Sequence, residues 1–260
     1  MEAFYFGPSD TYLFGIFHPP QNGNRREGIV LCNPFGQEYM RAHRSLRRLA
    51  IELAKLGYSV LRFDYRGTGD SAASLDSVTA ADWLEDIGHA VQELIDIAAV
   101  PKVTLLGLRM GGLLAAHVAA HHPSVTRLLL WDPAMSGHEY IEELRQNITA
   151  RSDKPSRTKF VAADGALHFN GFCLSKEFQR SLLTLDSCAP AGLEAKTIAQ
   201  IISHDTPGFT AFRELLCKSP KYHHRLAPAP HDWNYVDHVG GILWPAPILD
   251  AIEQYFSSSL

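Results

Sequence analysis

The hexapeptide GLRMGG, residues 107–112, is the most informative stretch of this 260-residue chain. It follows a short apolar run at 103–106 and precedes an alanine-rich stretch with helical character at 113–120. A strand, a Gly-x-x-x-Gly turn and a helix in this order are the layout of a nucleophile elbow, whose apex is normally serine. The apex here is Arg109, which stays protonated and cannot attack a carbonyl carbon. The motif therefore predicts an elbow without its nucleophile.

Strand-like and helix-like segments alternate on both sides of this turn. We expect strands at 4–6, 12–18, 28–32, 58–63, 103–106, 125–131, 196–204 and 233–239. Helices are expected at 42–56, 83–97, 110–121, 209–218 and 247–256. Such alternation predicts an α/β domain over residues 1–260, with a mostly parallel eight-stranded sheet flanked by helices. Residues 136–195 interrupt the rhythm, and we interpret them as a cap inserted after the sixth strand.

Composition excludes several classes of function. The formal net charge is −4, so nucleic acid is not an expected partner. No run of about eighteen apolar residues is present, and the segment MEAFYFGPSD lacks the regions of a signal peptide, so we expect no membrane insertion and a cytoplasmic location. The four cysteines and thirteen histidines show no metal-ligand spacing. We therefore expect neither a metal nor a cofactor.

The glycines of the elbow indicate how its apex is used. Gly107 and Gly111 permit a tight turn that directs Arg109 into a pocket, beside the N-terminus of the following helix. Backbone donors and a guanidinium at one place would attract an anion. The alternative is that Arg109 pairs with a nearby acidic side chain and fills the pocket. Either way, the site should hold a protein acid or an acidic ligand.

Two further glycine-rich loops follow predicted strands. The loop CNPFGQE, residues 32–38, has the position of an oxyanion loop; Pro34 has no N–H, so Phe35 is the expected donor, together with Met110 of the elbow. Cys32 is expected in the core rather than as a replacement nucleophile. The loop DYRGTGDS, residues 64–71, is expected to have a mainly structural role.

An acid and a base should follow the later strands. Asp205, after the seventh predicted strand, has the usual acid position, and Asp132, after the sixth, is the alternative. For the base, His238 lies in the predicted last strand, and His231 would serve if that strand lies earlier. Spacing does not decide between these pairs.

The elbow, the DYRGTGDS loop and the strand order together resemble the α/β-hydrolase superfamily. A narrower resemblance is to the hydrolase-like proteins associated with exosortase A systems, which carry G-L-R-x-G at the elbow. It rests on FYFGPSDTYLFGIFHPP (4–20), LCNPFGQE (31–38) and GLRMGGLLAA (107–116). Some of these proteins have Gly-x-x-Phe-Trp before the last helix; GGILW (240–244) is similar and would place Trp244, not a histidine, near the base position.

Two functions follow. In the first, a hydrolase-like enzyme of esterase or thioesterase type works without a serine: Arg109 holds an oxyanion or anionic substrate, and His238 with Asp205 activates water. In the second, a non-catalytic pseudo-hydrolase binds a small acyl or anionic ligand. A free His–Asp pair beside Arg109 would favour the enzyme. A salt bridge from Arg109 to Asp132 or Asp205 would favour the binding protein.

Overall fold

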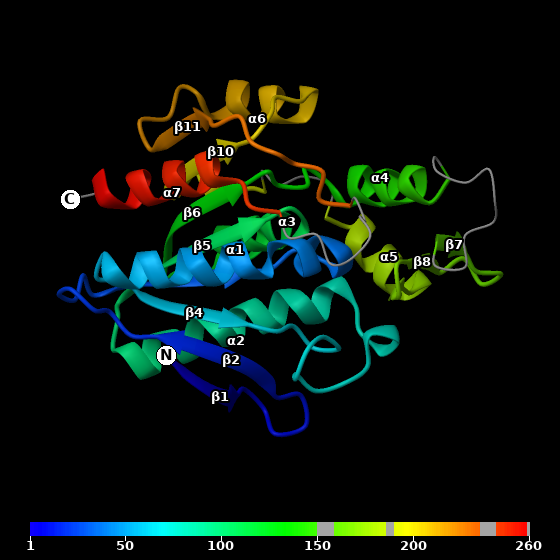
Figure 1. Ribbon diagram of the computed structural model, residues 1–260, viewed down its shortest axis with the longest axis horizontal. Coiled ribbons are helices and arrows are strands. Elements are labelled where there is room, and N and C mark those ends of the chain that lie inside the picture. Colours follow the sequence, from blue (N-terminus) through cyan, green and yellow to red (C-terminus); the bar gives the residue numbers. More distant parts are fainter. Residues whose placement is uncertain (150–158, 186–189, 235–242, 259–260) are drawn as a thin grey trace.

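A computed structural model describes residues 1–149, 159–185, 190–234 and 243–258. At its centre is an eight-stranded sheet in the order β1-β2-β4-β3-β5-β6-β10-β11 (Figure 1). β1 and β2 form an antiparallel hairpin that also pairs antiparallel with β4, and the remaining neighbours run parallel. The strands are β1 (Glu2–Phe6), β2 (Leu13–His18), β3 (Glu27–Cys32), β4 (Ser59–Phe63), β5 (Lys102–Leu108), β6 (Val125–Trp131), β10 (Thr197–Ile202) and β11 (Tyr222–Leu226).

Helices cover both faces of this sheet. They are α1 (Gly36–Lys55), α2 (Ala80–Ala98), α3 (Met110–His121), α6 (Pro207–Leu216) and α7 (Ala246–Ser258). Apolar side chains of α1 and α7 form one core with one face of the strands, and those of α2 and α3 form a second core with the other face. Alternate residues of β3 show the division: Ile29 and Leu31 belong to the first core, Val30 and Cys32 to the second. This is the α/β-hydrolase fold.

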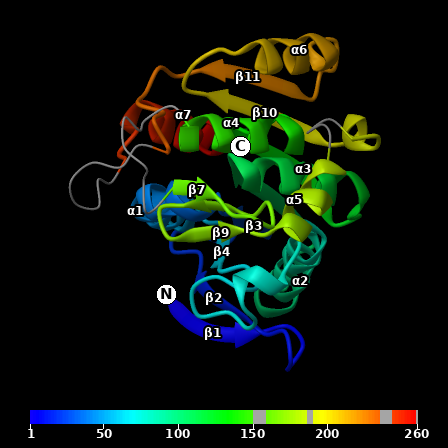
Figure 2. The same ribbon diagram turned by 90° about the vertical axis from the view of Figure 1, so that its right-hand side faces the viewer.

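The segment predicted as a cap holds a separate group of elements between β6 and β10. They are α4 (Gly137–Thr149), β7 (Lys159–Val161), β8 (Leu167–Phe169), β9 (Phe172–Leu174) and α5 (Lys176–Leu183), and the three short strands form their own antiparallel sheet. These elements lie together on the right of Figure 1 and face the viewer in Figure 2. Residues 150–158 of its charged stretch lie outside the described residues.

The last strand of the sheet lies earlier in the chain than predicted. The eighth strand is β11, with the sequence YHHRL, and Trp233 and Asn234 form a turn; residues 235–239 lie outside the described part of the chain. β11 lies at the sheet edge, where most of its side chains remain at least partly exposed, so it lacks the apolar pattern of a buried strand. The helix expected from residue 42 begins six residues earlier, at Gly36.

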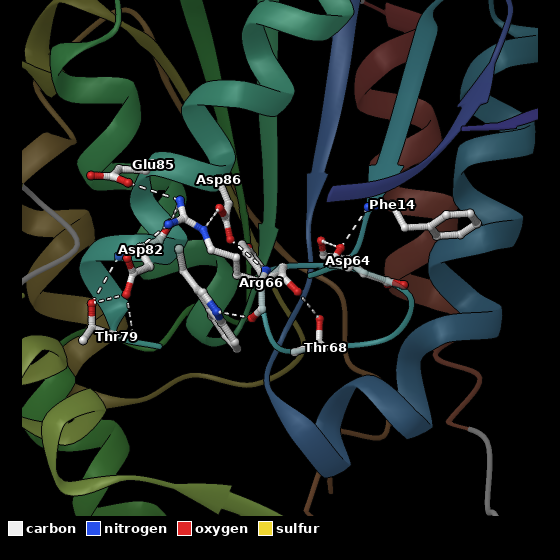
Figure 3. Close-up of polar contacts among 11 residues, drawn as sticks. Phe14, Asp64, Arg66, Thr68, Thr79, Asp82, Glu85 and Asp86 are labelled. Carbon is white, nitrogen blue, oxygen red and sulfur yellow. Dashed lines mark hydrogen bonds and ion pairs between the residues drawn. The ribbon is translucent and has the colours of Figure 1, made fainter. Parts of the chain in front are cut away.

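The DYRGTGDS loop ties three elements together (Figure 3). Arg66 is buried and its guanidinium bonds to Asp86 at 2.6 Å, and to Asp82 and Glu85 at 3.1 Å, all on α2. Burial raises the pKa of Asp86 to about 6, although the bonds to Arg66 oppose the shift. Ser71 Oγ donates to the Asp64 carbonyl at 2.6 Å and accepts from the backbone N–H of Phe14 on β2 at 2.8 Å. These contacts match a structural role.

Within the described residues, none of the helices has the length and apolar character needed to cross a membrane.

Candidate functional site

The elbow turn lies between β5 and α3, and its apex has an unusual backbone. Arg109 has φ 54° and ψ −122°, a combination rarely adopted by L-residues and maintained only by a rigid surround. A Cβ atom on Gly111 would lie 2.2 Å from the carbonyl oxygen of Cys32, at the end of β3. A Cβ atom on Gly107 would lie 2.5 Å from the carbonyl oxygen of Gly111. Only glycine therefore fits at these two positions, as the motif predicts.

The Arg109 side chain is paired with two carboxylates. Its Nε donates to Glu38 Oε1 at 3.1 Å, and its Nη2 donates to Glu143 Oε2. Glu38 belongs to the first turn of α1 and is fully buried, whereas Glu143 belongs to the cap helix α4 and is partly exposed. Arg109 is itself 7% exposed. One guanidinium thus connects the elbow, helix α1 after the loop 32–38, and helix α4.

Two neutral groups complete this ion cluster. The Tyr140 hydroxyl donates to Glu38 Oε2 at 3.0 Å, and Asn234 Nδ2 donates to Glu38 Oε1 at 3.2 Å and to Glu143 Oε1 at 3.3 Å. Burial raises the pKa of Glu38 above its usual value, and the Arg109 guanidinium opposes that shift. Burial also disfavours the charged form of Arg109, but the two carboxylates outweigh it and raise the pKa of Arg109. Arg109 is therefore a fixed cation whose charge the protein compensates.

A cavity of about 170 Å³ opens beside this cluster. Its lining includes Arg109, Glu139, Tyr140, Glu143, His204 and His231. These side chains come from the elbow, the cap helix, and the segments that follow β10 and β11. The cavity therefore lies at the carboxyl ends of the parallel strands, where open α/β sheets place their ligands.

A series of hydrogen bonds connects the residue after β6 to the cavity. Asp132, buried directly after β6, accepts from the backbone N–H and the hydroxyl of Ser203, both at 2.7 Å. Ser203 Oγ lies 3.0 Å from Nδ1 of His204, whose ring stacks on that of His231 with 3.8 Å between centroids. Burial lowers the pKa of His204, with Asp132 opposing and the neighbouring His231 and Arg109 reinforcing the shift. His204 is therefore neutral at pH 7.

Asp205, the acid expected after β10, does not reach this cavity. Asp205 is exposed and bonds within its own segment, to the N–H of Thr206 at 3.1 Å, to the Thr210 hydroxyl at 3.0 Å and to Arg213 at 3.2 Å. It does not appear among the described residues that line the cavity. His238 lies outside the described residues. The two alternatives do reach the cavity: Asp132 is connected to its lining residue His204 through Ser203, and His231 lines it.

The other residues singled out in the sequence lie in the core or at the surface. Phe35 precedes α1, and its ring packs among Trp83, Phe172 and Phe178. Met110 is the first residue of α3 and is buried. Trp244 lies shortly before α7 and is 51% exposed. Cys32 is fully buried at the end of β3, and burial raises the pKa of its thiol, so it belongs to the core as expected.

Sequence reasoning missed the partners of Arg109. Glu38 stands at the end of the glycine-containing loop CNPFGQE, but only the three-dimensional structure brings it to the elbow. No sequence motif marks the other residues of the cluster and the cavity, which are Glu143, Tyr140, Asn234 and His204. One signal was available: a buried guanidinium needs an acid, so acidic residues of the neighbouring loops were the natural candidates.

Comparison with known proteins identifies the family. Residues 23–182 match the family model described as serine aminopeptidase, S33. The chain belongs to this family. Among curated proteins, this S33 family member is 35% identical over 72 residues to the putative carbamate hydrolase RutD of Variovorax paradoxus, covering 28% of this chain and 26% of that protein. It is 35% identical over 79 residues to the mitochondrial palmitoyl-protein thioesterase ABHD10 of Bos taurus, covering 30% and 24%. The matches thus span about a quarter of each relative.

Solved structures resemble this S33 family member along its whole length. Est1E of Butyrivibrio proteoclasticus with bound ferulic acid has a TM-score of 0.64 at 18% identity, covering 99% of this chain and 97% of that one. Mouse alpha/beta hydrolase domain-containing protein 10 has a TM-score of 0.63 at 16% identity, and the bottromycin epimerase BotH with bottromycin A2 has 0.61 at 18%; both comparisons cover 100% of each chain. At these identities the likeness establishes the fold. The chain is a hydrolase-like member of the α/β-hydrolase superfamily.

Proposed function

We propose that this protein binds a small acyl ligand in the elbow cavity without hydrolysing it. The observation that carries the proposal is the pairing of Arg109 with Glu38 and Glu143 at the place where a hydrolase holds its nucleophile. A guanidinium has no lone pair to offer a carbonyl carbon, and this one is held in position by two carboxylates. The acyl class is supported by the names of the relatives, a thioesterase and a carbamate hydrolase.

The charges around the cavity favour a neutral or cationic ligand over an anion. Glu38, Glu139 and Glu143 surround the single charge of Arg109, and the neutral His204 adds none. The sequence left open whether a protein acid or a ligand would pair with Arg109; protein acids have that position here. An amide ligand would donate its N–H to Glu143, and its acyl chain would meet the apolar side chains of Phe209 and Trp233.

One observation favours a second function, hydrolysis by activated water. The chain Asp132–Ser203–His204 ends in a neutral imidazole at the cavity, which is the arrangement of a general base. His231, stacked on His204, could take the same role. Such an enzyme would lack the covalent step that a serine provides, and losing a triad nucleophile costs several orders of magnitude in rate.

Assays with reactive esters separate these two functions. We expect turnover of p-nitrophenyl acetate and butyrate no faster than in the His204→Gln and His231→Gln variants, because no nucleophile stands at the elbow. A fluorophosphonate probe should label no serine of the folded protein. Turnover that disappears in His204→Gln would support hydrolysis by activated water and overturn the binding proposal. Labelling of a serine would overturn both functions.

Removing the Glu143 charge should change which ligands bind. In the wild type, butyramide should raise the melting temperature more than butyrate at equal concentration, because the carboxylate of butyrate meets Glu139 and Glu143. In Glu143→Gln this preference should reverse, since one edge of the Arg109 guanidinium loses its charged partner. Glu142→Gln, on the same helix and paired with Arg145 at 3.7 Å, is the matched control. A wild type that prefers butyrate would show an anion site instead.

A further inference from the structure

One edge of the central sheet is open. β1 is the outermost strand at that end, and among the described strands only β2 pairs with it, through five consecutive residue pairs. The strand lies at the bottom of Figure 1, at the opposite end of the sheet from β11. The outer edge of such a strand presents N–H and C=O groups to which a further strand can bind.

The backbone groups that face outward follow from the bonds of β2. The N–H and the C=O of Phe14 both point toward β4, because the N–H donates to Ser71 Oγ at 2.8 Å and the C=O accepts from the N–H of Asp64 at 2.9 Å. Phe14 stands opposite Tyr5, so the N–H and C=O of Tyr5 point away from β2. Those of Ala3, two residues earlier, point the same way. The outer edge therefore offers the backbone groups of Ala3 and Tyr5.

This edge lacks the features that usually keep strands of other molecules away. The sequence of β1 is EAFYF, with no proline or lysine, and its pairing with β2 shows no bulge. The opposite edge strand, β11, has the sequence YHHRL and carries Arg225. On β1, Tyr5 is 61% exposed, and its ring meets that of Tyr12 edge-on with 5.3 Å between centroids. Apolar surface thus lies beside the free backbone groups.

A second copy of the same strand matches this edge in its backbone. Two β1 strands can pair antiparallel about a two-fold axis, so that each copy uses the same surface. An axis at Phe4, the middle of β1, places Ala3 of each copy opposite Tyr5 of the other. Both residues have outward-facing N–H and C=O groups, so each such pair exchanges two hydrogen bonds.

The side chains fit the same register, because large residues lie beside small ones. Tyr5 of one copy lies next to Ala3 of the other, and Met1, which is 66% exposed, lies next to Gly7. Gly7, Tyr5 and Tyr12 line a hollow of about 380 Å³ that is open to solvent, and a Cβ atom on Gly7 would meet nothing within 4 Å. The Met1 side chain of the second copy would enter this hollow.

No like charges face each other in this arrangement. Glu2 is the one charged side chain in the sequence of residues 1–7, and with the axis at Phe4 it lies opposite Phe6 of the second copy. The acidic side chains of the two copies are therefore at opposite ends of the contact. An axis at Tyr5 would instead set the two Tyr5 side chains beside each other.

We propose that two copies of this chain associate through β1, as an antiparallel pair centred on Phe4 that joins their two sheets into one. The contact runs along a single short strand, at the low end of interface sizes, so the dimer is weak and reversible. It is independent of the function proposed above, because residues 1–7 do not line the elbow cavity.

The test is sedimentation equilibrium of the full chain from low micromolar to near-millimolar concentration. We expect a monomer–dimer equilibrium in the wild type. Ala3→Pro removes an outward N–H and spares the bonds to β2, and Tyr5→Lys places a charge on the edge, so each should raise the dimer dissociation constant at least tenfold. Leu215→Lys introduces the same charge at a 66% exposed leucine of α6, at the far end of the sheet, and should leave the constant within twofold of the wild type.

Three results would overturn the proposal. The first is a wild type that stays monomeric at every concentration, which would leave the edge to a strand of another protein. The second is a folded Ala3→Pro, with the circular dichroism of the wild type, that dimerises as tightly as the wild type; if Ala3→Pro does not fold, Tyr5→Lys decides in the same way. The third is a Leu215→Lys that dissociates as readily as Tyr5→Lys, which would show a general effect of charge. None of these results bears on the elbow proposal.

Discussion

Replacing Arg109 by methionine should lower the free energy of unfolding by about 3–5 kcal/mol, the usual cost of leaving one member of a buried ion pair unpaired. Methionine keeps much of the side-chain volume, so the loss reports the charge rather than a cavity. Among the described residues, fully buried Glu38 would then retain only Tyr140 and Asn234 as donors. Urea unfolding of both proteins at pH 7 measures the difference.

This cost should depend on pH in a defined direction. Burial already raises the pKa of Glu38, and removing Arg109 removes the main opposing influence, so the folded-state pKa rises further. The folded protein then holds this proton more tightly than the unfolded chain, in which the pKa of glutamate is about 4.3. The variant is therefore most stable below that pH and loses stability as pH rises through the folded-state pKa. We expect a larger deficit at pH 8 than at pH 5.

A double variant serves as the control. Glu38→Gln in the Arg109→Met background removes the orphaned charge, so it should recover part of the lost stability and abolish the added pH dependence. If Arg109→Met alone costs less than about 1 kcal/mol, a range typical of exposed ion pairs, the cluster does not hold the cap to the elbow.

Gly111→Ala should be comparably damaging for a different reason. The new Cβ atom would lie 2.2 Å from the Cys32 carbonyl oxygen and 2.4 Å from that of Asn33, and both are backbone atoms of the strand end. Neither can rotate away, so β3 and α3 must separate, and we expect a loss of at least about 3 kcal/mol, at the upper end for overpacked cores. Thermal unfolding followed by circular dichroism measures it.

Gly88→Ala is the matched control for that substitution. Gly88 lies inside α2, and a Cβ atom there meets nothing within 4 Å. Alanine should therefore raise stability by about 0.5–1 kcal/mol through its higher helix propensity. If Gly111→Ala unfolds at the same temperature as the wild type, the close approach between elbow and strand does not constrain the fold.

Much of this architecture could be predicted from the sequence because its signals are local. The elbow glycines, the buried strands β3 to β6 and the amphipathic helices α2 and α3 each follow from residues close together in the chain. β11 could not be predicted in the same way, because an edge strand with the sequence YHHRL has no apolar pattern. The small cap strands are three residues each, too short for periodicity.

The site was harder to predict because its contacts are distant in sequence. Glu38 and Arg109 are 71 residues apart, and Asn234 reaches Glu38 across 196 residues. The elbow motif predicted where Arg109 would point, but no spacing rule names the acid that pairs with it. Because β11 ends at Leu226, earlier than the predicted last strand, the segment that follows it brings His231 to the cavity.

The Arg109–Glu38 pair also makes a serine at position 109 difficult to introduce. Arg109→Ser alone would spell a hydrolase elbow but would strand the Glu38 charge in the core, and Glu38→Gln alone would leave Arg109 with one partly exposed partner. Either single substitution would cost a large fraction of the free energy of unfolding, which is ~5–15 kcal/mol for an ordinary domain. Two codons would have to change together before selection could act on activity. The pair thus opposes single substitutions at either position, and this constrains which sequences the elbow can adopt.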